Sequence, residues 1–68
     1  MARGTVKYFN DTKGYGFIVP EGQSESEVFV HFSAIESSGF RTLHEGEHVE
    51  FEAVSSTRGT EATHVLKV

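Results

Sequence analysis

The sequence predicts an all-β fold, a barrel of five short strands in a single domain that spans residues 1–68. Five segments rich in β-branched and aromatic residues alternate between apolar and polar positions, which is typical of strands with one buried face. Polar turns that contain glycine separate these segments, and no stretch carries the repeat of a long helix. Because a small sheet that closes on itself leaves no unpaired edge, we expect a closed barrel.

The first two strands form a predicted hairpin. Residues 5–9 give the first strand and residues 15–20 the second, and the turn at 10–14 contains asparagine, aspartate and glycine. Tyr8 and Phe9 are neighbours and should point to opposite faces of the strand, but alternation does not decide which of them is buried. A β-bulge would exchange the faces of the residues that follow it.

Three more strands are expected, over residues 27–32, residues 48–53 and about residues 61–68. The side chains expected inward from the last two strands are Val49, Phe51, Ala53, Thr63 and Val65. Ser33 and Glu36 have the spacing of a capping box, which predicts a short helical turn after the third strand. The long connection over residues 37–47 is expected to be mostly loop.

The composition favours a soluble protein of a reducing compartment. The chain has no cysteine and therefore no disulfide or thiolate site. No apolar run approaches the roughly 18 residues of a membrane span, and the first residues lack the apolar core of a signal peptide. We therefore expect a cytoplasmic protein, monomeric and without membrane association.

Charge is distributed unevenly along the chain, whose formal net charge is −4. Residues 1–20 carry Arg3, Lys7 and Lys13 against one aspartate, whereas the nine glutamates all follow residue 20. An acidic protein with a local basic surface can still attract phosphate, although with strong salt dependence. A well-solvated surface is the simpler explanation of the charge pattern taken alone.

The stretch Lys13-Gly14-Tyr15-Gly16-Phe17-Ile18 points to nucleic acid. In a strand, Tyr15 and Phe17 share one face while Gly16 and Ile18 share the other. Two aromatic rings separated by glycine, with a lysine at the entrance, suit a surface on which bases stack while the lysine meets a phosphate. The pattern also matches the start of the basic-Gly-aromatic-Gly-Phe ribonucleoprotein signature.

The stretch Val28-Phe29-Val30-His31-Phe32 extends this surface. Phe29 and His31 share a face in a strand, and the two valines share the other. If this strand pairs antiparallel with the preceding one, Tyr15, Phe17, Phe29 and His31 form one aromatic patch above two aliphatic sets.

A zinc enzyme is the first alternative, because His44-Glu45-Gly46-Glu47-His48 has the letters of the H-E-x-x-H motif. That chemistry needs both histidines one turn apart on a stable helix, together with a third ligand. Here a glycine interrupts the motif and a predicted strand begins at its second histidine. We therefore expect no catalytic residue, no metal and no cofactor.

Five motifs are similar to those of bacterial-type cold-shock proteins, in the same order and spacing over almost the whole chain. They are Gly4-Thr5-Val6-Lys7-Tyr8-Phe9-Asn10, Lys13-Gly14-Tyr15-Gly16-Phe17-Ile18, Val28-Phe29-Val30-His31-Phe32-Ser33-Ala34-Ile35, Gly39-Phe40-Arg41-Thr42-Leu43 and Glu45-Gly46. The resemblance implies a single cold-shock domain with a five-stranded antiparallel OB-fold β-barrel. It also implies binding to single-stranded RNA and DNA with little sequence selectivity. Family members act as RNA chaperones and in some cases as transcription antiterminators or translation regulators.

The same resemblance assigns site residues. The positions that match nucleic-acid contacts of the family are Lys7, Tyr8, Phe9, Asn10, Lys13, Tyr15, Phe17, Glu27, Phe29, His31, Phe32, Phe40 and Arg58. The rings would stack on bases, the lysines and arginine would contact the backbone, and Asn10 and Glu27 would make polar contacts to bases. Phe40 could equally anchor its loop onto the barrel.

Two departures from the family predict weaker binding. Tyr8 stands where the family usually has tryptophan, which offers a larger stacking surface. Gly59-Thr60-Glu61-Ala62 stands where Gly-Pro-Gln-Ala is common, so the loop loses a proline and gains a negative charge.

A peptide-binding barrel is the second alternative. An exposed aromatic patch on an SH3-like barrel could bind a proline-rich peptide instead of bases. The basic entrance at Lys7 and Lys13 and the glycines between the rings favour nucleic acid.

Overall fold

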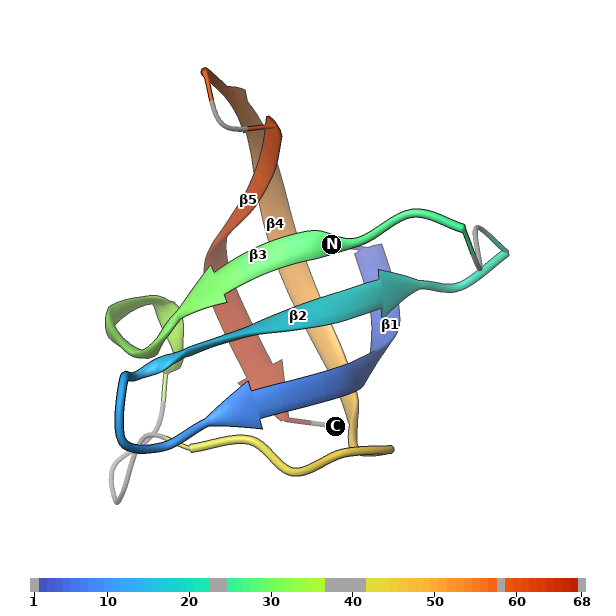
Figure 1. Ribbon diagram of the computed structural model, residues 1–68. Helices are drawn as coiled ribbons and strands as arrows, with labels where there is room; N and C mark the ends of the chain where they lie inside the picture. The colour runs from blue at the N-terminus through green and yellow to red at the C-terminus, as the bar shows by residue number, and fades with distance from the viewer. Residues whose placement is uncertain (1, 23–24, 37–41, 58, 68) are drawn as a thin grey trace.

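The computed structural model describes residues 2–22, 25–36, 42–57 and 59–67, and within them the predicted all-β barrel is confirmed. The elements are β1 (Ala2–Asn10), β2 (Tyr15–Pro20), β3 (Val28–His31), the 3₁₀ helix η1 (Phe32–Ala34), β4 (His48–Ser56) and β5 (Gly59–Lys67) (Figure 1). The strands follow the order β1-β2-β3-β5-β4 around a closed barrel, as in an OB-fold. The described chain contains no helix long and apolar enough to cross a membrane.

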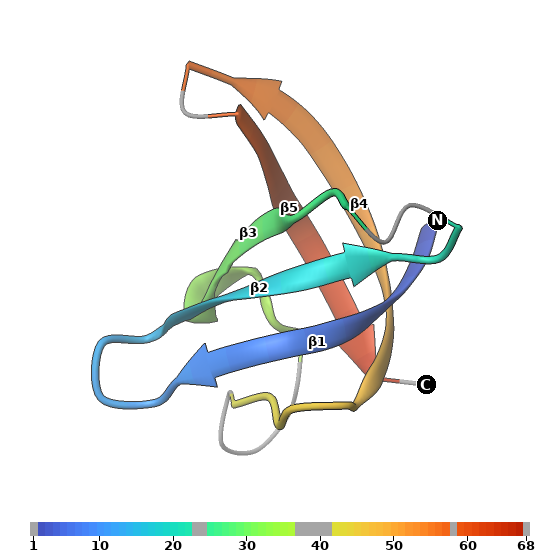
Figure 2. The ribbon, with the colours of Figure 1, turned by 45° about the vertical axis from the view of Figure 1, so that its right-hand side comes forward.

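The barrel combines an antiparallel meander with one parallel closure. β1, β2 and β3 run side by side on one side of the molecule, and β4 and β5 cross behind them (Figures 1 and 2). β1 also pairs antiparallel with β4, and β4 with β5. The closing pair is parallel, with Phe29 of β3 opposite Glu61 of β5, so antiparallel pairing holds for the other four strand pairs.

The core fills the inside of this barrel with aliphatic side chains. The buried hydrophobic residues are Val6, Ile18, Val28, Val30, Ala34, Ile35, Leu43, Val49, Phe51, Ala62 and Val65. Each strand contributes through its inward positions, so the other face of β1, β2 and β3 points away from the core. Thr42 is buried beside them and donates its hydroxyl hydrogen to Asp11 Oδ1, which ties the loop before β4 to the β1–β2 turn.

A bulge between β4 and β5 corrects one inward prediction, that of Thr63. The register shifts between Glu52 and Ala53, so Thr63 becomes an extra residue on β5. Thr63 is therefore exposed, and Ala62 enters the core in its place. Ala53 keeps the alternation of β4 and lies on the same side as Phe51, opposite Ala62, but it is exposed because it is at the open end of the barrel. The strict alternation used for the prediction fails at a bulge, because one added residue rotates the side chains beyond it to the opposite face.

The helical turn after β3 is present, but its cap differs from the prediction. η1 begins at Phe32, and His31 rather than Ser33 is the N-cap residue. The Nδ1 atom of His31 accepts a hydrogen bond from the backbone N–H of Ser33. Ser33 is thus inside the turn, where its side chain cannot cap it.

β1 and β4 extend further than predicted and β5 begins earlier, whereas β3 is shorter than the predicted residues 27–32 because η1 begins at Phe32. β1 begins at Ala2, and the Arg3 guanidinium donates to Glu50 of β4 at 2.9 Å. β4 and β5 continue past the barrel as a two-stranded hairpin that projects from one end (Figures 1 and 2). His44 to Glu47 form a turn in which Gly46 has a φ of +83°, so this segment is not the helix of a zinc motif.

Candidate nucleic-acid interface

Four aromatic rings form a continuous outward surface on β1, β2 and β3. We call this surface the aromatic platform, and it consists of Tyr8, Tyr15, Phe17 and Phe29. Phe17 is its centre, because its ring centroid lies 5.5 Å from that of Tyr8, 6.5 Å from Tyr15 and 5.8 Å from Phe29. All four side chains are partly exposed, so ring faces remain accessible.

Strand register explains the position of each ring. Phe17 of β2 is paired with Tyr8 of β1 on one side and with Phe29 of β3 on the other. Tyr15 is two residues before Phe17 and therefore on the same face, and its ring stacks on that of Phe29 at 5.7 Å. The antiparallel pairing expected from the sequence is confirmed for these strands.

A β-bulge in β1 resolves the choice between Tyr8 and Phe9. The register shifts between Val6 and Tyr8, so Lys7 is the extra residue. Val6 can then point into the core while Tyr8 joins the platform. Phe9 turns to the other side and packs against the core, so the structure does not bring it into the platform.

Gly16 allows β1 and β2 to approach closely beneath the platform. A Cβ atom at this position would lie 2.3 Å from the carbonyl oxygen of Tyr8 and 2.8 Å from Cα of Phe9. Both atoms belong to the backbone, so the strands would have to move apart. The close packing of β1 against β2 therefore requires a glycine at this position. The rings of Tyr15 and Phe17 lie on the opposite, outward face of β2.

His31 and Phe32 form a second aromatic group beside the platform. Their ring centroids lie 4.6 Å apart, and 43% of Phe32 is exposed. The backbone N–H of Phe32 donates to the carbonyl oxygen of Gly14 at 2.8 Å, which fixes η1 to the β1–β2 turn. Gly14 has a φ of +77°, and a Cβ atom there would lie 2.7 Å from the Phe32 ring. The signature glycine thus leaves room for a ring of the site.

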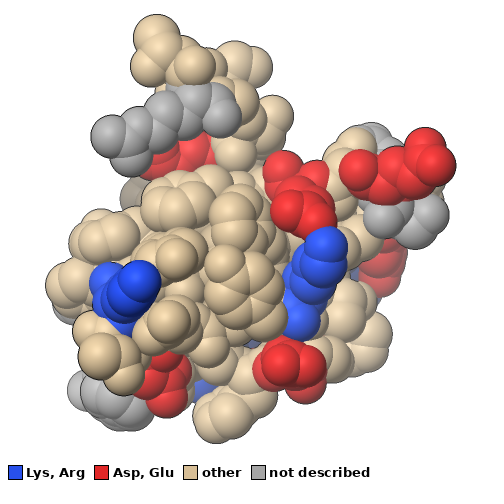
Figure 3. Space-filling view, in the orientation of Figure 1, with Lys and Arg blue, Asp and Glu red and all other residues tan. Residues whose placement is uncertain are grey.

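Basic side chains flank the aromatic surface on two sides. Figure 3 shows a broad uncharged area over β1–β3 with blue side chains at two of its margins and red side chains close to one of them. Lys7 forms an ion pair with Glu27, and both side chains remain about half exposed. Lys13 is exposed in the β1–β2 turn and makes no ion pair with a residue that the structure describes.

Two predicted polar contacts have structural partners. Asn10 Oδ1 accepts a hydrogen bond from the backbone N–H of Lys13 at 2.9 Å, so this oxygen shapes the turn. Glu27 holds Lys7, as described above.

The pKa of the Tyr8 phenol is raised above its usual value near 10. Desolvation is the largest cause, followed by the negative charge of an ionised Tyr15, a hydrogen bond with Tyr15 and the carboxylate of Glu27. The ammonium group of Lys7 opposes these effects. The phenol of Tyr8 is therefore neutral at physiological pH.

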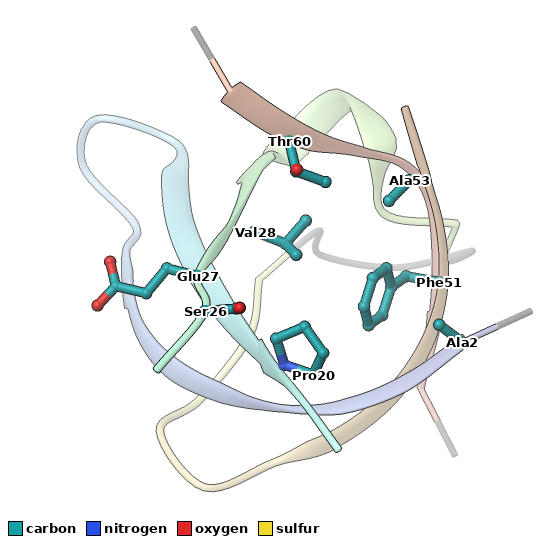
Figure 4. A pocket seen from close by; sticks show the side chains of 8 residues that line it. All are labelled: Ala2, Pro20, Ser26, Glu27, Val28, Phe51, Ala53 and Thr60. Atoms are coloured by element: carbon teal, nitrogen blue, oxygen red, sulfur yellow. The ribbon is translucent and has the colours of Figure 1, made fainter. Parts of the chain in front are cut away.

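A pocket of about 240 Å³ opens at one end of the barrel but is separate from the platform. Figure 4 shows Val28, Phe51 and Pro20 pointing into it, while Glu27 points the other way. The alternation along the start of β3 explains this difference, since Glu27 and Val28 are neighbours. The pocket is the open end of the hydrophobic core, and Glu27 belongs to the outer surface.

Ser33 is the residue of this region that the sequence reasoning did not assign to the site. Its hydroxyl oxygen lies 3.0 Å from Nδ1 of His31. A serine two residues after a histidine at a strand end is the available signal, but such a pair is too common to carry a prediction. Phe40 and Arg58, which the resemblance includes, lie outside the described residues.

Comparison with known proteins decides the family. The profile of the "'Cold-shock' DNA-binding domain" matches residues 2–68. The chain belongs to the cold-shock domain family. It is 56% identical to cold shock protein CspB of Bacillus caldolyticus over 68 residues, which are 100% of both chains. It is 54% identical over the same full length to CspA of Staphylococcus saprophyticus and to CspB of Geobacillus stearothermophilus.

Family membership gives the protein a general role. As a cold-shock domain protein, the chain binds nucleic acid and is not an enzyme. Residues 44–48, which carry the letters of a zinc motif, form a turn and the start of β4 in this cold-shock domain. The peptide-binding alternative had no support beyond the exposed rings, and the family favours nucleic acid.

Proposed function

We propose that this protein binds single-stranded RNA and DNA with little sequence selectivity, by stacking bases on the aromatic platform while lysines hold the backbone. The observation that carries the proposal is the adjacency of Tyr8, Phe17 and Phe29 on three neighbouring strands. Base–aromatic stacking tolerates any sequence, because every base has a flat π face. A duplex hides those faces, so the platform favours unpaired strands.

RNA chaperone activity would follow from this preference. A protein that binds only the unpaired form of an RNA stabilises that form in proportion to its occupancy. The same effect on a structured transcript would make the protein a transcription antiterminator or a translation regulator. One barrel supplies all four platform rings, so we propose that the protein acts as a monomer. We also propose a cytoplasmic location, as expected from the composition of the sequence.

Acidic neighbours would limit the affinity. Lys7 is already neutralised by Glu27, and Glu61 is paired with Phe29 at the margin of the platform. Tyr8 also offers less stacking area than the tryptophan usual at this position. We therefore propose the binding mode of the family with weaker affinity than that of a typical member.

Intrinsic fluorescence provides the direct test. The chain has two tyrosines and no tryptophan, and both tyrosines belong to the platform. We expect saturable quenching by oligothymidine of about seven nucleotides and little quenching by a duplex of equal length. The affinity for the single strand should fall as salt rises. Equal quenching by both, or none at low salt, would contradict the proposal.

A further inference from the structure

The imidazole ring of His31 is held at one of its two nitrogens. Nδ1 lies 3.4 Å from the backbone nitrogen of Ser33, whose N–H points to it, and 3.0 Å from the Ser33 hydroxyl oxygen. The ring also contacts Phe32, at a centroid distance of 4.6 Å and an angle of 42°. In the described part of the chain no group pairs with Nε2, at the other edge of the exposed ring.

This arrangement selects one neutral form of the ring. A neutral imidazole carries a single proton, on either Nδ1 or Nε2. A proton on Nδ1 would face the N–H of Ser33, whereas a bare Nδ1 accepts from that N–H and from the hydroxyl. The proton therefore resides on Nε2, which becomes a hydrogen-bond donor directed to solvent.

We propose that Ser33 is a positioning residue that fixes His31 as the Nε2–H form, so that His31 donates a hydrogen bond to a carbonyl oxygen of a base stacked on Phe32. The inference rests on the proposed function of the platform and adds one directed polar contact to it. The stacking rings accept any base, whereas a donor of fixed direction distinguishes bases by the acceptor that they place beside it.

The surroundings of the ring support this role. Phe32 is 43% exposed, and its backbone is anchored to Gly14, so the stacking face next to His31 has a fixed position. Tyr15 is the register partner of His31, which places the donor next to the platform on the same sheet. A base stacked on Phe32 would therefore lie beside the His31 ring, because the two rings are immediate neighbours.

Nuclear magnetic resonance of the full chain tests the positioning step without any ligand. Two-bond ¹H–¹⁵N spectra at about pH 8, where an ordinary imidazole is neutral, distinguish the two proton positions. We expect a single Nε2–H pattern for His31, a mixture of forms in Ser33→Ala and recovery of the single pattern in Ser33→Thr. Ser55→Ala is the matched control, because Ser55 is an exposed serine on the β4–β5 hairpin. A mixture in the unchanged protein, or no response to Ser33→Ala, would overturn the inference.

A chemical substitution in the ligand tests the recognition step. In an oligothymidine, one thymidine at a time is replaced by the difluorotoluene nucleoside, which has the same shape but poor acceptors. We expect one position at which the unchanged protein and Ser55→Ala prefer thymine about fivefold. The preference at that position should fall below about twofold in Ser33→Ala and in His31→Phe.

The two kinds of failure can be told apart. Strong binding with the same preference in Ser33→Ala would overturn the inference and leave the platform intact. Absence of binding to any of the oligonucleotides would overturn the proposed function, and the recognition role of His31 with it, while the spectra would still report the proton position.

Discussion

Phe17 of β2 and Phe29 of β3 are paired in register, and their rings meet edge to face with centroids 5.8 Å apart. The same Phe17 also contacts Tyr8 on its other side. One side chain therefore holds the rings of three strands at fixed positions. Loss of Phe17 removes a stacking surface and also the support of its neighbours.

Phe17→Ala should weaken binding to oligothymidine by about tenfold or more, since one base–aromatic stack contributes about 1–3 kcal/mol. Fluorescence anisotropy with a labelled oligonucleotide measures the effect, and circular dichroism checks that the barrel survives. Leu66→Ala is a suitable control, because this exposed residue is on β5 outside the platform. Equal affinities of the two variants would disprove the platform.

Lys13→Gln should reduce the salt dependence of binding. Lys13 is exposed beside the aromatic surface, and one phosphate contact on a single strand contributes about −0.7 to the slope of log affinity against log salt. The slope should therefore become shallower by about 0.7. Lys67→Gln serves as the control, since Lys67 is on β5 near Glu47, at 3.9 Å. A slope unchanged from that of the control would exclude a backbone contact by Lys13.

Glu61→Gln should strengthen binding at low salt. Glu61 is the register partner of Phe29, so its charge repels a phosphate chain that crosses the platform. At near-surface distances this repulsion corresponds to about a two- to threefold change in affinity, which salt should screen. Glu52→Gln makes the same charge change on an exposed side chain of β4. If both variants gain equally, the effect comes from net charge and not from position.

Tyr8 should ionise only above pH 10, because desolvation, Tyr15 and Glu27 raise its pKa. In Tyr15→Phe, Tyr8 is the sole tyrosine, so absorbance at 295 nm reports it directly. This variant loses the effects of Tyr15 but keeps those of desolvation and Glu27. The midpoint of Tyr8 ionisation should therefore still lie above about pH 10, although lower than in the unchanged protein.

The sign of the stability effect follows from the raised pKa of Tyr8. The folded protein holds this proton more tightly than the unfolded chain, so the contribution to stability is complete below about pH 10. This contribution is lost as the pH rises through the pKa that Tyr8 has in the folded protein. As the pH is raised above 10, the free energy of unfolding measured in urea should therefore fall less for Tyr8→Phe than for the unchanged protein. A Tyr8 transition at or below pH 10 would contradict this prediction.

Gly16→Ala should destabilise the barrel by about 3 kcal/mol or more, because its Cβ would overlap the backbone of β1. Urea unfolding followed by circular dichroism measures the change. Gly22→Ala is the comparison, since Gly22 has a φ of +78° but no atom within 4 Å of the added Cβ. That change should cost only the backbone strain, about 1–2 kcal/mol. Similar losses would show that the close approach at Gly16 can relax.

Alternation was sufficient wherever the strands are regular. It placed Tyr15 and Phe17 on the outer face and Ile18 in the core, and it did the same for Phe29 and Val30 on β3. These residues are the centre of the platform, so most of the geometry of the site could be expected from periodicity alone.

The errors lie where the backbone departs from regular pairing. The bulge at Lys7 left the Tyr8–Phe9 choice open, and the bulge at Thr63 made the inward prediction for Thr63 wrong. A bulge depends on how two strands that are distant in sequence meet, so local pattern does not reveal it. His31 caps the helix instead of Ser33 for a similar reason, since Phe32 is fixed by a hydrogen bond to Gly14 in the β1–β2 turn.

The parallel contact of β3 with β5 is a short seam, formed by the Phe29–Glu61 pair and continued by the bridge between Ile35 and Val65. Amide hydrogens along a short seam exchange with solvent through small openings, before the whole domain unfolds. All four platform rings lie on the continuous meander of β1, β2 and β3, which such an opening leaves paired. The β3–β5 pair can therefore open locally while the spacing of the four rings is unchanged. A bound single strand would accordingly protect the amide hydrogens of the meander from exchange more than those of the β3–β5 pair.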